Sequence, residues 1–179
     1  MIALGFALRS LFLGDHFMPI DKNNYAWLDG LGTLPRIIVE SRALVGILET
    51  PGSANNSVII GWAKEVGGSV EKTYTADSVP WCGLFMALVA RRAGKTPPVD
   101  PLWALNWGKF GERAGQPMLG DVLTFIRPGG GHVALYVGED GDHYHVINGN
   151  ISDQVCFSRI EKTRLRAALR TPYMTTPGS

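Results

Sequence analysis

Cysteine is scarce in this sequence. Only Cys82 and Cys156 occur among its 179 residues. Two cysteines are too few for the disulfide framework of a small secreted domain, and they cannot make a four-cysteine zinc module. They leave three alternatives: one disulfide bridge, two inert buried thiols, or one reactive thiol.

A surplus of charge and a long apolar run are missing as well. The 17 Lys and Arg nearly balance the 16 Asp and Glu, for a net charge of +1. Because a dedicated nucleic-acid binder needs a large basic surplus, we expect no nucleic-acid partner. No apolar run approaches the ~18–20 residues of a membrane span, so we expect no stable membrane insertion. The apolar fraction of 45% is typical of a globular protein, and the length suits one domain.

The N-terminus is apolar but lacks the features of a signal peptide. Arg9 interrupts the stretch 1–13, no basic residue precedes it, and no A-x-A cleavage site follows. Met18 is an alternative start, and a short packed helix is another interpretation. We therefore expect residues 1–18 to be an extension of uncertain status and residues 19–179 to form a single domain.

The first half of the chain has helical patterning. Apolar residues at helical spacing predict helices over 36–49 and 57–66, with Asn55–Ser57 as N-cap candidates for the second. A third helix is expected over 80–92, with Ser78 as its cap and Pro80 in its first turn. Residues 101–110 predict a short helix or turn.

The second half has strand patterning. Alternating and β-branched segments separated by Gly and Pro predict five strands, at 121–127, 132–138, 143–150, 154–160 and 165–171. Helices followed by an antiparallel meander predict an α+β fold. Residues 158–170 carry five basic residues and one acid, which indicates either a solvated edge or a surface that adheres to an anionic polymer.

Cys82 lies in the predicted first turn of the third helix. Unsatisfied N–H groups at a helix start favour an anion, so a thiol there is biased toward thiolate. Gly83 beside it allows another backbone or a substrate to come close. The alternative is a buried core cysteine, the usual fate of an unpaired Cys.

His132 changes that balance. It follows a run of three glycines and opens a strand whose apolar residues alternate with it. If the core face is formed by Val133, Leu135 and Val137, His132 points the opposite way, toward an element such as the Cys82 helix. A Cys–His pair makes a thiolate–imidazolium nucleophile.

The segments TADSVPWCGLFMALVARRAG, GDVLTF, GGGHVALYVGED and NGNISD occur in this order. Together they resemble the NlpC-type and CHAP-type cysteine hydrolases of bacteria and phages, most of all the single-domain, phage endolysin-like branch. The resemblance covers roughly residues 34–170. It implies a papain-like α+β fold, with N-terminal helices packed on a C-terminal antiparallel sheet of about five strands. It also implies peptidoglycan as substrate, Cys82 as nucleophile, His132 as base and no cofactor.

The resemblance further implies a third polar residue that orients His132. The chain offers Asn148 and Asn150 and no acid at that place. A three-residue hairpin loop over 139–141 sets His132 opposite Asn148, whereas a two-residue turn at 140–141 puts Asn148 on the other side of the sheet. We therefore predict the three-residue loop and Asn148, with Asn150 as the runner-up.

Four aromatic residues are candidates for binding substrate, although at helical spacing such residues are more often core. They are Tyr74, Trp81, Trp103 and Trp107. His143 and His145 alternate on one strand, but with the two cysteines they match no zinc spacing, so we expect no metal site.

Several functions remain open at this stage. A cell-wall hydrolase with this pair would cut either within the stem peptide, as an endopeptidase, or between muramic acid and L-Ala, as an amidase. We expect such an enzyme to be a monomer made in the bacterial cytoplasm and acting on the cell wall, as a phage lysin or after export. The alternatives are a lipid acyltransferase or thioesterase with the same pair, and a non-catalytic envelope-binding module.

Overall fold

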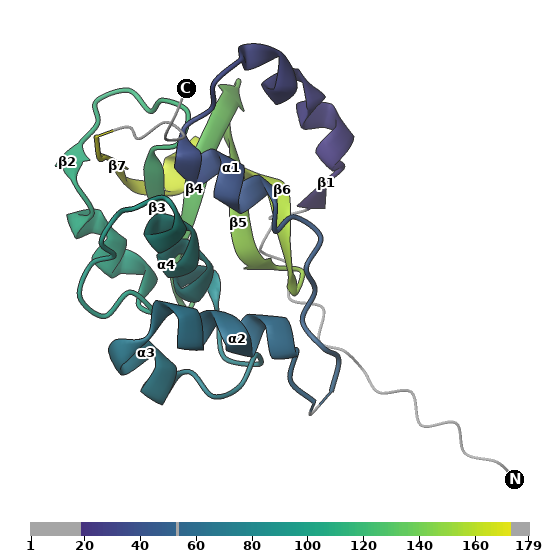
Figure 1. The fold of residues 1–179 in the computed structure, drawn as a ribbon. Helices are drawn as coiled ribbons and strands as arrows, with labels where there is room; N and C mark the ends of the chain where they lie inside the picture. The colour runs from purple at the N-terminus through teal and green to yellow at the C-terminus, as the bar shows by residue number, and fades with distance from the viewer. Residues whose placement is uncertain (1–18, 53, 173–179) are drawn as a thin grey trace, which may run out of the picture.

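Helices from the first half of the chain pack against an antiparallel sheet from the second half (Figure 1). The computed structural model describes residues 19–52 and 54–172. The predicted N-terminal extension, residues 1–18, lies outside the described residues. Helix α4 lies against the middle of the sheet, on β4 and β5. The predicted α+β class is confirmed.

All five predicted strands are present. They are β3 (Val122–Arg127), β4 (Gly130–Asp140), β5 (His143–Ile151), β6 (Gln154–Glu161) and β7 (Leu165–Arg170). Two short strands, β1 (Pro19–Ile20) and β2 (Glu112–Arg113), extend the sheet at its edges. The order is β1-β6-β5-β4-β3-β7-β2, so β7 returns to pair with β3 instead of continuing the meander.

The helices follow the sequence signals in part. They are η1 (Lys22–Leu31), α1 (Arg36–Arg42), α2 (Ser57–Val66), α3 (Gly68–Thr73), α4 (Cys82–Arg92), η2 (Ala104–Lys109) and η3 (Lys162–Arg164), where η marks a 3-10 helix. The Asn56 side chain caps α2 by accepting the N–H groups of Val58 and Ile59, as predicted. Among the described residues, no helix has the length and apolar character needed to cross a membrane.

Helix α1 ends seven residues before the predicted end of its periodic pattern. The segment that follows pairs like a strand: Gly46 donates its N–H to the Val155 carbonyl, and the N–H of Val155 donates to Ile47. Gly46 has a φ of +96°, which lets the chain leave the helix. Pairing with the start of β6 thus overrides the helical spacing of residues 44–48.

Helix α4 begins two residues later than predicted, at Cys82. Trp81 occupies the N-cap position, and no side chain caps the helix, so the predicted Ser78 cap is wrong. The Trp81 indole is fully buried and fixes the chain at this point. The first N–H groups of α4 therefore stay available around the Cys82 side chain.

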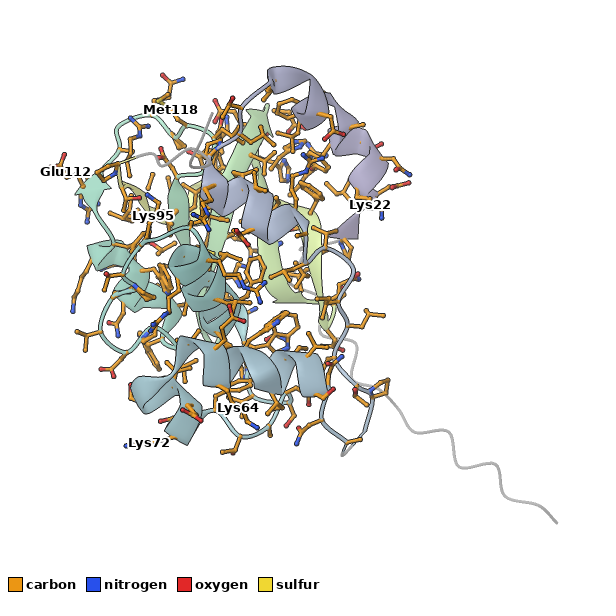
Figure 2. The ribbon with its side chains drawn as sticks, in the orientation of Figure 1. Lys22, Lys64, Lys72, Lys95, Glu112 and Met118 are labelled. Atoms are coloured by element: carbon orange, nitrogen blue, oxygen red, sulfur yellow. The ribbon has the colours of Figure 1, made fainter. Side chains whose placement is uncertain are left out.

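Both faces of the sheet are buried. Helix α4 packs on the face that carries Val133, Leu135 and Val137. His132 shares the other face with Ala134 and Tyr136, which belong to a second apolar cluster. The prediction that the Cys82 helix covers the His132 face is therefore wrong, because the apolar residues of β4 recruit the helix. Charged side chains such as Lys64, Lys72 and Glu112 lie at the periphery (Figure 2).

The basic stretch 158–170 is largely neutralised within the chain. Four of its five cations form ion pairs, namely Arg159 with Asp140, Lys162 with Glu139, Arg164 with Glu161 and Arg170 with Asp121. The first three pairs are at the surface, where ion pairs contribute little to stability. This arrangement favours the interpretation as a solvated edge over adhesion to an anionic polymer.

The fourth pair joins a partly exposed arginine to a buried carboxylate, and it links the start of β3 to the end of β7. Arg170 donates from Nε and Nη2 to the Asp121 carboxylate, at distances down to 2.7 Å. The N–H of Met118 donates to the same carboxylate. Asp121 is only 1% exposed, so its charge depends on these donors.

We expect Asp121→Asn to destabilise the fold by about 1–2 kcal/mol, because the buried carboxylate that accepts from Arg170 and from the Met118 N–H loses its charge. Urea denaturation followed by circular dichroism measures this. The matched control is Asp29→Asn, which breaks the exposed Arg42–Asp29 pair and should change stability by less than about 0.5 kcal/mol. Equal effects of the two variants would contradict a special role of the buried carboxylate.

Candidate active site

Cys82 is the first residue of α4 and lies at the wall of a cleft. Its side chain is 4% exposed. The cysteine is free and so is Cys156, which removes the disulfide alternative within this structure. Cys156 lies in the second apolar cluster, on the far face of the sheet from α4.

Gly83 is required where it stands because a second backbone crosses α4 there. A Cβ on Gly83 would lie 2.4 Å from the Pro101 carbonyl oxygen. The Trp107 indole holds the same carbonyl by donating from Nε1 at 2.9 Å. The close approach predicted at Gly83 is present, and the approaching group is the backbone of residues 101–102. This contact brings the far wall of the cleft next to Cys82.

His132 and Asn148 are in contact inside the sheet, as predicted. The His132 Nε2 atom lies 2.8 Å from Asn148 Oδ1, and both side chains are fully buried. The Asn148 amide nitrogen donates to the Cys156 carbonyl at 2.9 Å and to Ser158 Oγ at 3.0 Å. Since a carbonyl can only accept, this fixes the amide with its oxygen toward the ring.

The orientation of the amide determines the tautomer of His132. An acceptor faces Nε2, so Nε2 carries the hydrogen and donates it to Asn148. In the neutral ring the lone pair is then on Nδ1. Nδ1 is therefore the ring nitrogen that could accept a proton. Ser158, which sequence reasoning missed, is a buried polar residue in an otherwise apolar part of β6, and that pattern is the signal that could have revealed it.

The hairpin reaches this contact by a different route from the predicted one. Asp140 pairs with His143, so the turn is residues 141–142 and the predicted three-residue loop is wrong. This turn alone would put Asn148 on the wrong side of the sheet. A β-bulge between Tyr136 and Gly138 shifts the register by one residue and restores the side, which makes Asn148 a diagonal neighbour of His132.

Asn150, the runner-up, is used elsewhere. Its Oδ1 accepts the N–H of Trp81 at 3.2 Å, and its backbone has a φ of +63°. It therefore tethers the residue before Cys82 to the end of β5. Gly149 supports the same contact, because a Cβ there would lie 2.7 Å from the Trp81 ring.

The thiol of Cys82 lies beside the peptide bond that joins His132 to Val133. Burial raises the pKa of Cys82 above its ordinary value. The charge of Arg127 and the backbone N–H groups of Val133, Gly83 and Cys82 lower the pKa, but by less. The predicted bias toward thiolate is thus outweighed by desolvation, and the resting group is a thiol that needs a base.

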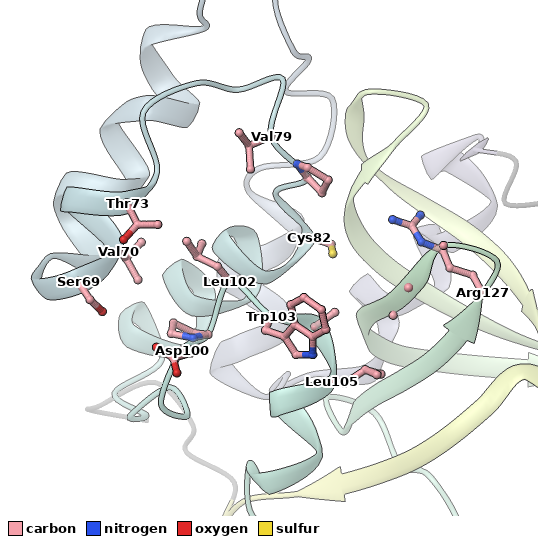
Figure 3. A pocket seen from close by; sticks show the side chains of 16 residues that line it. Ser69, Val70, Thr73, Val79, Cys82, Asp100, Leu102, Trp103, Leu105 and Arg127 are labelled. Atoms are coloured by element: carbon pink, nitrogen blue, oxygen red, sulfur yellow. The ribbon is translucent and has the colours of Figure 1, made fainter.

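The cleft has a volume of about 460 Å³. Figure 3 shows Cys82 between Val79 on one side and Trp103 on another, with Arg127 facing across from the β3–β4 hairpin. Most of the wall is apolar, and Trp103 is 63% exposed on it. Trp103 is therefore the predicted aromatic residue that the fold brings to the cleft.

The other three aromatic candidates are core residues. Trp81 and Trp107 are fully buried and Tyr74 is 2% exposed, so they are not placed to touch a substrate in the cleft. The Tyr74 hydroxyl donates to the Val79 carbonyl, and burial raises the pKa of Tyr74. These residues support the cleft walls from behind, which corrects their predicted role.

The alternating histidines belong to a separate surface network. His145 contacts the Tyr25 hydroxyl through Nδ1 and Asp140 through Nε2, each at 2.9 Å. His143 lies 3.5 Å from Arg159. Within residues 19–52 and 54–172, no three side chains of the His, Cys, Asp and Glu types come together in a way that could hold a metal ion.

The chain has few recognisable relatives. No protein-family model matches it, and no curated protein matches it. Among solved structures it is similar to the resuscitation promoting factor interacting protein RipA in a mutated form, with 17% sequence identity and a TM-score of 0.47. The match covers 75% of this chain and 60% of that chain. The chain itself has a cysteine at a helix start, against an antiparallel sheet that carries a histidine.

The raised pKa of Cys82 predicts how the thiol reacts with iodoacetamide. Because only the thiolate reacts, the alkylation rate should keep rising beyond pH ~8.5, where an ordinary cysteine is half ionised. Mass spectrometry of the intact protein measures the rate. In the Cys82→Ser variant, Cys156 should stay unmodified, since burial raises its pKa to about 12. A plateau below pH 7 would show a resting thiolate and contradict this expectation.

Proposed function

We propose that this protein is a cysteine hydrolase that cleaves an amide bond of bacterial peptidoglycan. The observation that carries the proposal is the fixed tautomer of His132, held by Asn148 at 2.8 Å, with Nδ1 left as the base. Support also comes from the Cys82 thiol beside residues 132–133 and at the wall of an open cleft. A nucleophile, a base and an orienting amide are the three parts that such chemistry needs.

The His132 ring lies on the face of β4 opposite the one that α4 covers, so the proposed reaction requires the ring to come within reach of the thiol. In the first half of the reaction, His132 Nδ1 then takes the thiol proton as Cys82 Sγ attacks the carbonyl carbon of the amide. The carbonyl oxygen becomes an oxyanion. The backbone N–H of Cys82 at the uncapped start of α4 is the donor that stabilises it. The imidazolium then gives its proton to the amide nitrogen, the C–N bond breaks, and an amine leaves.

In the second half, the acyl group is held as a thioester on Cys82. His132 takes a proton from water, and the hydroxide attacks the thioester carbonyl. The C–S bond breaks and the sulfur leaves as thiolate, which regains a proton from the imidazolium. Asn148 keeps the ring in one plane throughout and accepts from Nε2–H in both the neutral and the charged state of His132.

Peptidoglycan is proposed as the substrate because the order of the motifs around Cys82 and His132 resembles that of cell-wall hydrolases. Both the endopeptidase and the amidase reaction suit the same residues, because each breaks an amide. We further propose that the protein acts on the cell wall, as a phage-type lysin or after export. Trp103 would contact the glycan or peptide at the mouth of the cleft.

The decisive experiment is digestion of purified peptidoglycan with mass spectrometry of the products. The wild type should release new amino and carboxyl termini at one type of amide bond, and the masses identify that bond. Cys82→Ser should reduce the release by at least roughly 10³-fold, because a hydroxyl lacks the nucleophilicity of a thiolate. Cys156→Ser exchanges the same atom in the other cysteine and should keep most of the activity.

Two results would contradict the proposal. Absence of any product with folded wild-type protein would exclude peptidoglycan as substrate. Equal loss of activity in Cys82→Ser and Cys156→Ser, with both variants folded, would contradict the assignment of Cys82 as nucleophile.

Asn148→Ala should lower turnover roughly 10²-fold without abolishing it. The His132 ring loses the contact that orients it, but the imidazole can still accept a proton. Steady-state rates on the identified bond measure this. Ser158→Ala removes only one of the two acceptors of the Asn148 amide and should have a smaller effect. A larger loss of turnover in Ser158→Ala than in Asn148→Ala would contradict the proposal that Asn148 orients His132 and that Ser158 only helps to hold Asn148.

A second candidate is transfer or hydrolysis of a fatty acyl group by the same residues. The observation that favours it is the apolar wall of the cleft, with Val70, Val79 and Leu102 among the residues that line it. Incubation with acyl thioesters distinguishes the two. Formation of a stable acyl-Cys82 adduct without release of peptidoglycan products would favour this candidate over the amide hydrolase.

A further inference from the structure

Arg127 is a cation that faces the cleft across from Cys82 (Figure 3). It is the last residue of β3 and lines the cleft together with the Cys82 thiol (Figure 3). Arg42, Arg92, Arg159 and Arg170 each bind a carboxylate of the chain. In the described part of the chain, by contrast, the Arg127 guanidinium makes no hydrogen bond or ion pair with another residue.

The surroundings of Arg127 leave room for a ligand. The hairpin that follows it contributes Gly129, Gly130 and Gly131 to the cleft wall, and these residues have no side chains that could occupy the space. Gly131 cannot carry a side chain, because a Cβ would lie 2.6 Å from the Leu105 side chain. Apolar residues make up most of the remaining wall, so Arg127 is the group there that would attract a negative charge.

The charge of Arg127 acts at the reacting atom. It is the one side-chain charge among the causes that lower the pKa of Cys82. The other charged residue of the cleft, Asp100, lies at the opposite end, beyond Leu102 and Trp103 in Figure 3. The cleft therefore attracts a negative group toward Arg127 and repels it from Asp100.

We propose that Arg127 forms a subsite for a carboxylate of the substrate, next to the bond that Cys82 attacks. A guanidinium presents paired N–H donors that match the two oxygens of a carboxylate. This proposal makes the proposed function more specific. It rests on that function for the statement that the substrate is a peptide. The favoured substrate is an acidic peptide, and its amidated counterpart, with a carboxamide in place of the carboxylate, is disfavoured.

The first test needs no substrate. Cys82 is alkylated at one pH with iodoacetate, which carries a carboxylate, and with the neutral iodoacetamide. Arg127→Gln should lower the ratio of the two rates roughly tenfold, because the attraction for the anionic reagent is lost. The control is Arg113→Gln, an exposed arginine on the edge strand β2, which should leave the ratio unchanged. An unchanged ratio in Arg127→Gln overturns the subsite.

The second test uses two synthetic stem peptides that differ only in a free or amidated carboxyl group beside the cleaved bond. The wild type should cleave the free acid with a kcat/KM roughly 10- to 100-fold higher. Arg127→Gln should remove this preference, and Arg113→Gln should keep it. Equal cleavage of both peptides by the wild type overturns the subsite while the hydrolase function stands.

The two tests separate the two proposals. If the wild type cleaves neither peptide but the alkylation ratio falls in Arg127→Gln, the carboxylate subsite is supported and the peptide hydrolase function is wrong. If peptides are cleaved and the ratio does not change, the subsite is wrong. Circular dichroism of each variant ensures that all comparisons are made between folded proteins.

Discussion

The hydrogen bond from His132 Nε2–H to Asn148 Oδ1 is the contact on which the candidate site depends. It fixes which ring nitrogen carries the hydrogen and so which one can act as a base. The contact forms only because β6 holds the Asn148 amide through the Cys156 carbonyl and Ser158. Three neighbouring strands must therefore be in register before His132 has a defined state. The bulge in β4 is part of this requirement, since it sets His132 and Asn148 on one side of the sheet.

The start of α4 depends on close backbone contacts rather than on a cap. Gly83 admits the carbonyls of residues 101–102, Gly149 admits the Trp81 ring, and Asn150 accepts the Trp81 N–H. The first two contacts exclude any side chain at Gly83 and Gly149. The third fixes the backbone of Trp81. Together they hold Cys82 against β4, with the N–H groups of Cys82 and Gly83 directed at its thiol. A capping side chain would have satisfied these groups and occupied the place that the proposed oxyanion needs.

The environment of the thiol is a balance between burial and charge. Desolvation keeps Cys82 protonated, whereas the Arg127 charge and three N–H groups favour the thiolate by a smaller amount. Such a thiol is unreactive until a base removes its proton, which makes a neutral, correctly oriented imidazole necessary. The same Arg127 charge that acts on the sulfur is available to a carboxylate in the cleft. Burial thus sets the resting state of the Cys82 thiol, and Arg127 is the basis of the proposed selectivity of the cleft.

Local patterns in the sequence determined the α+β class, the five main strands and α2 with its Asn56 cap, because period and capping chemistry act over a few residues. They also singled out Cys82 and His132, whereas Asn148 was predicted from the resemblance and from a hairpin register that differs from the observed one. Tertiary structure decided what depends on partners distant in sequence. Strand pairing with β6 shortened α1, packing buried Tyr74, Trp81 and Trp107, and a bulge replaced the predicted loop. The exposure of Trp103, the role of Ser158 and the place of Arg127 at the cleft follow from contacts across the sheet and the cleft, which no spacing along the chain encodes.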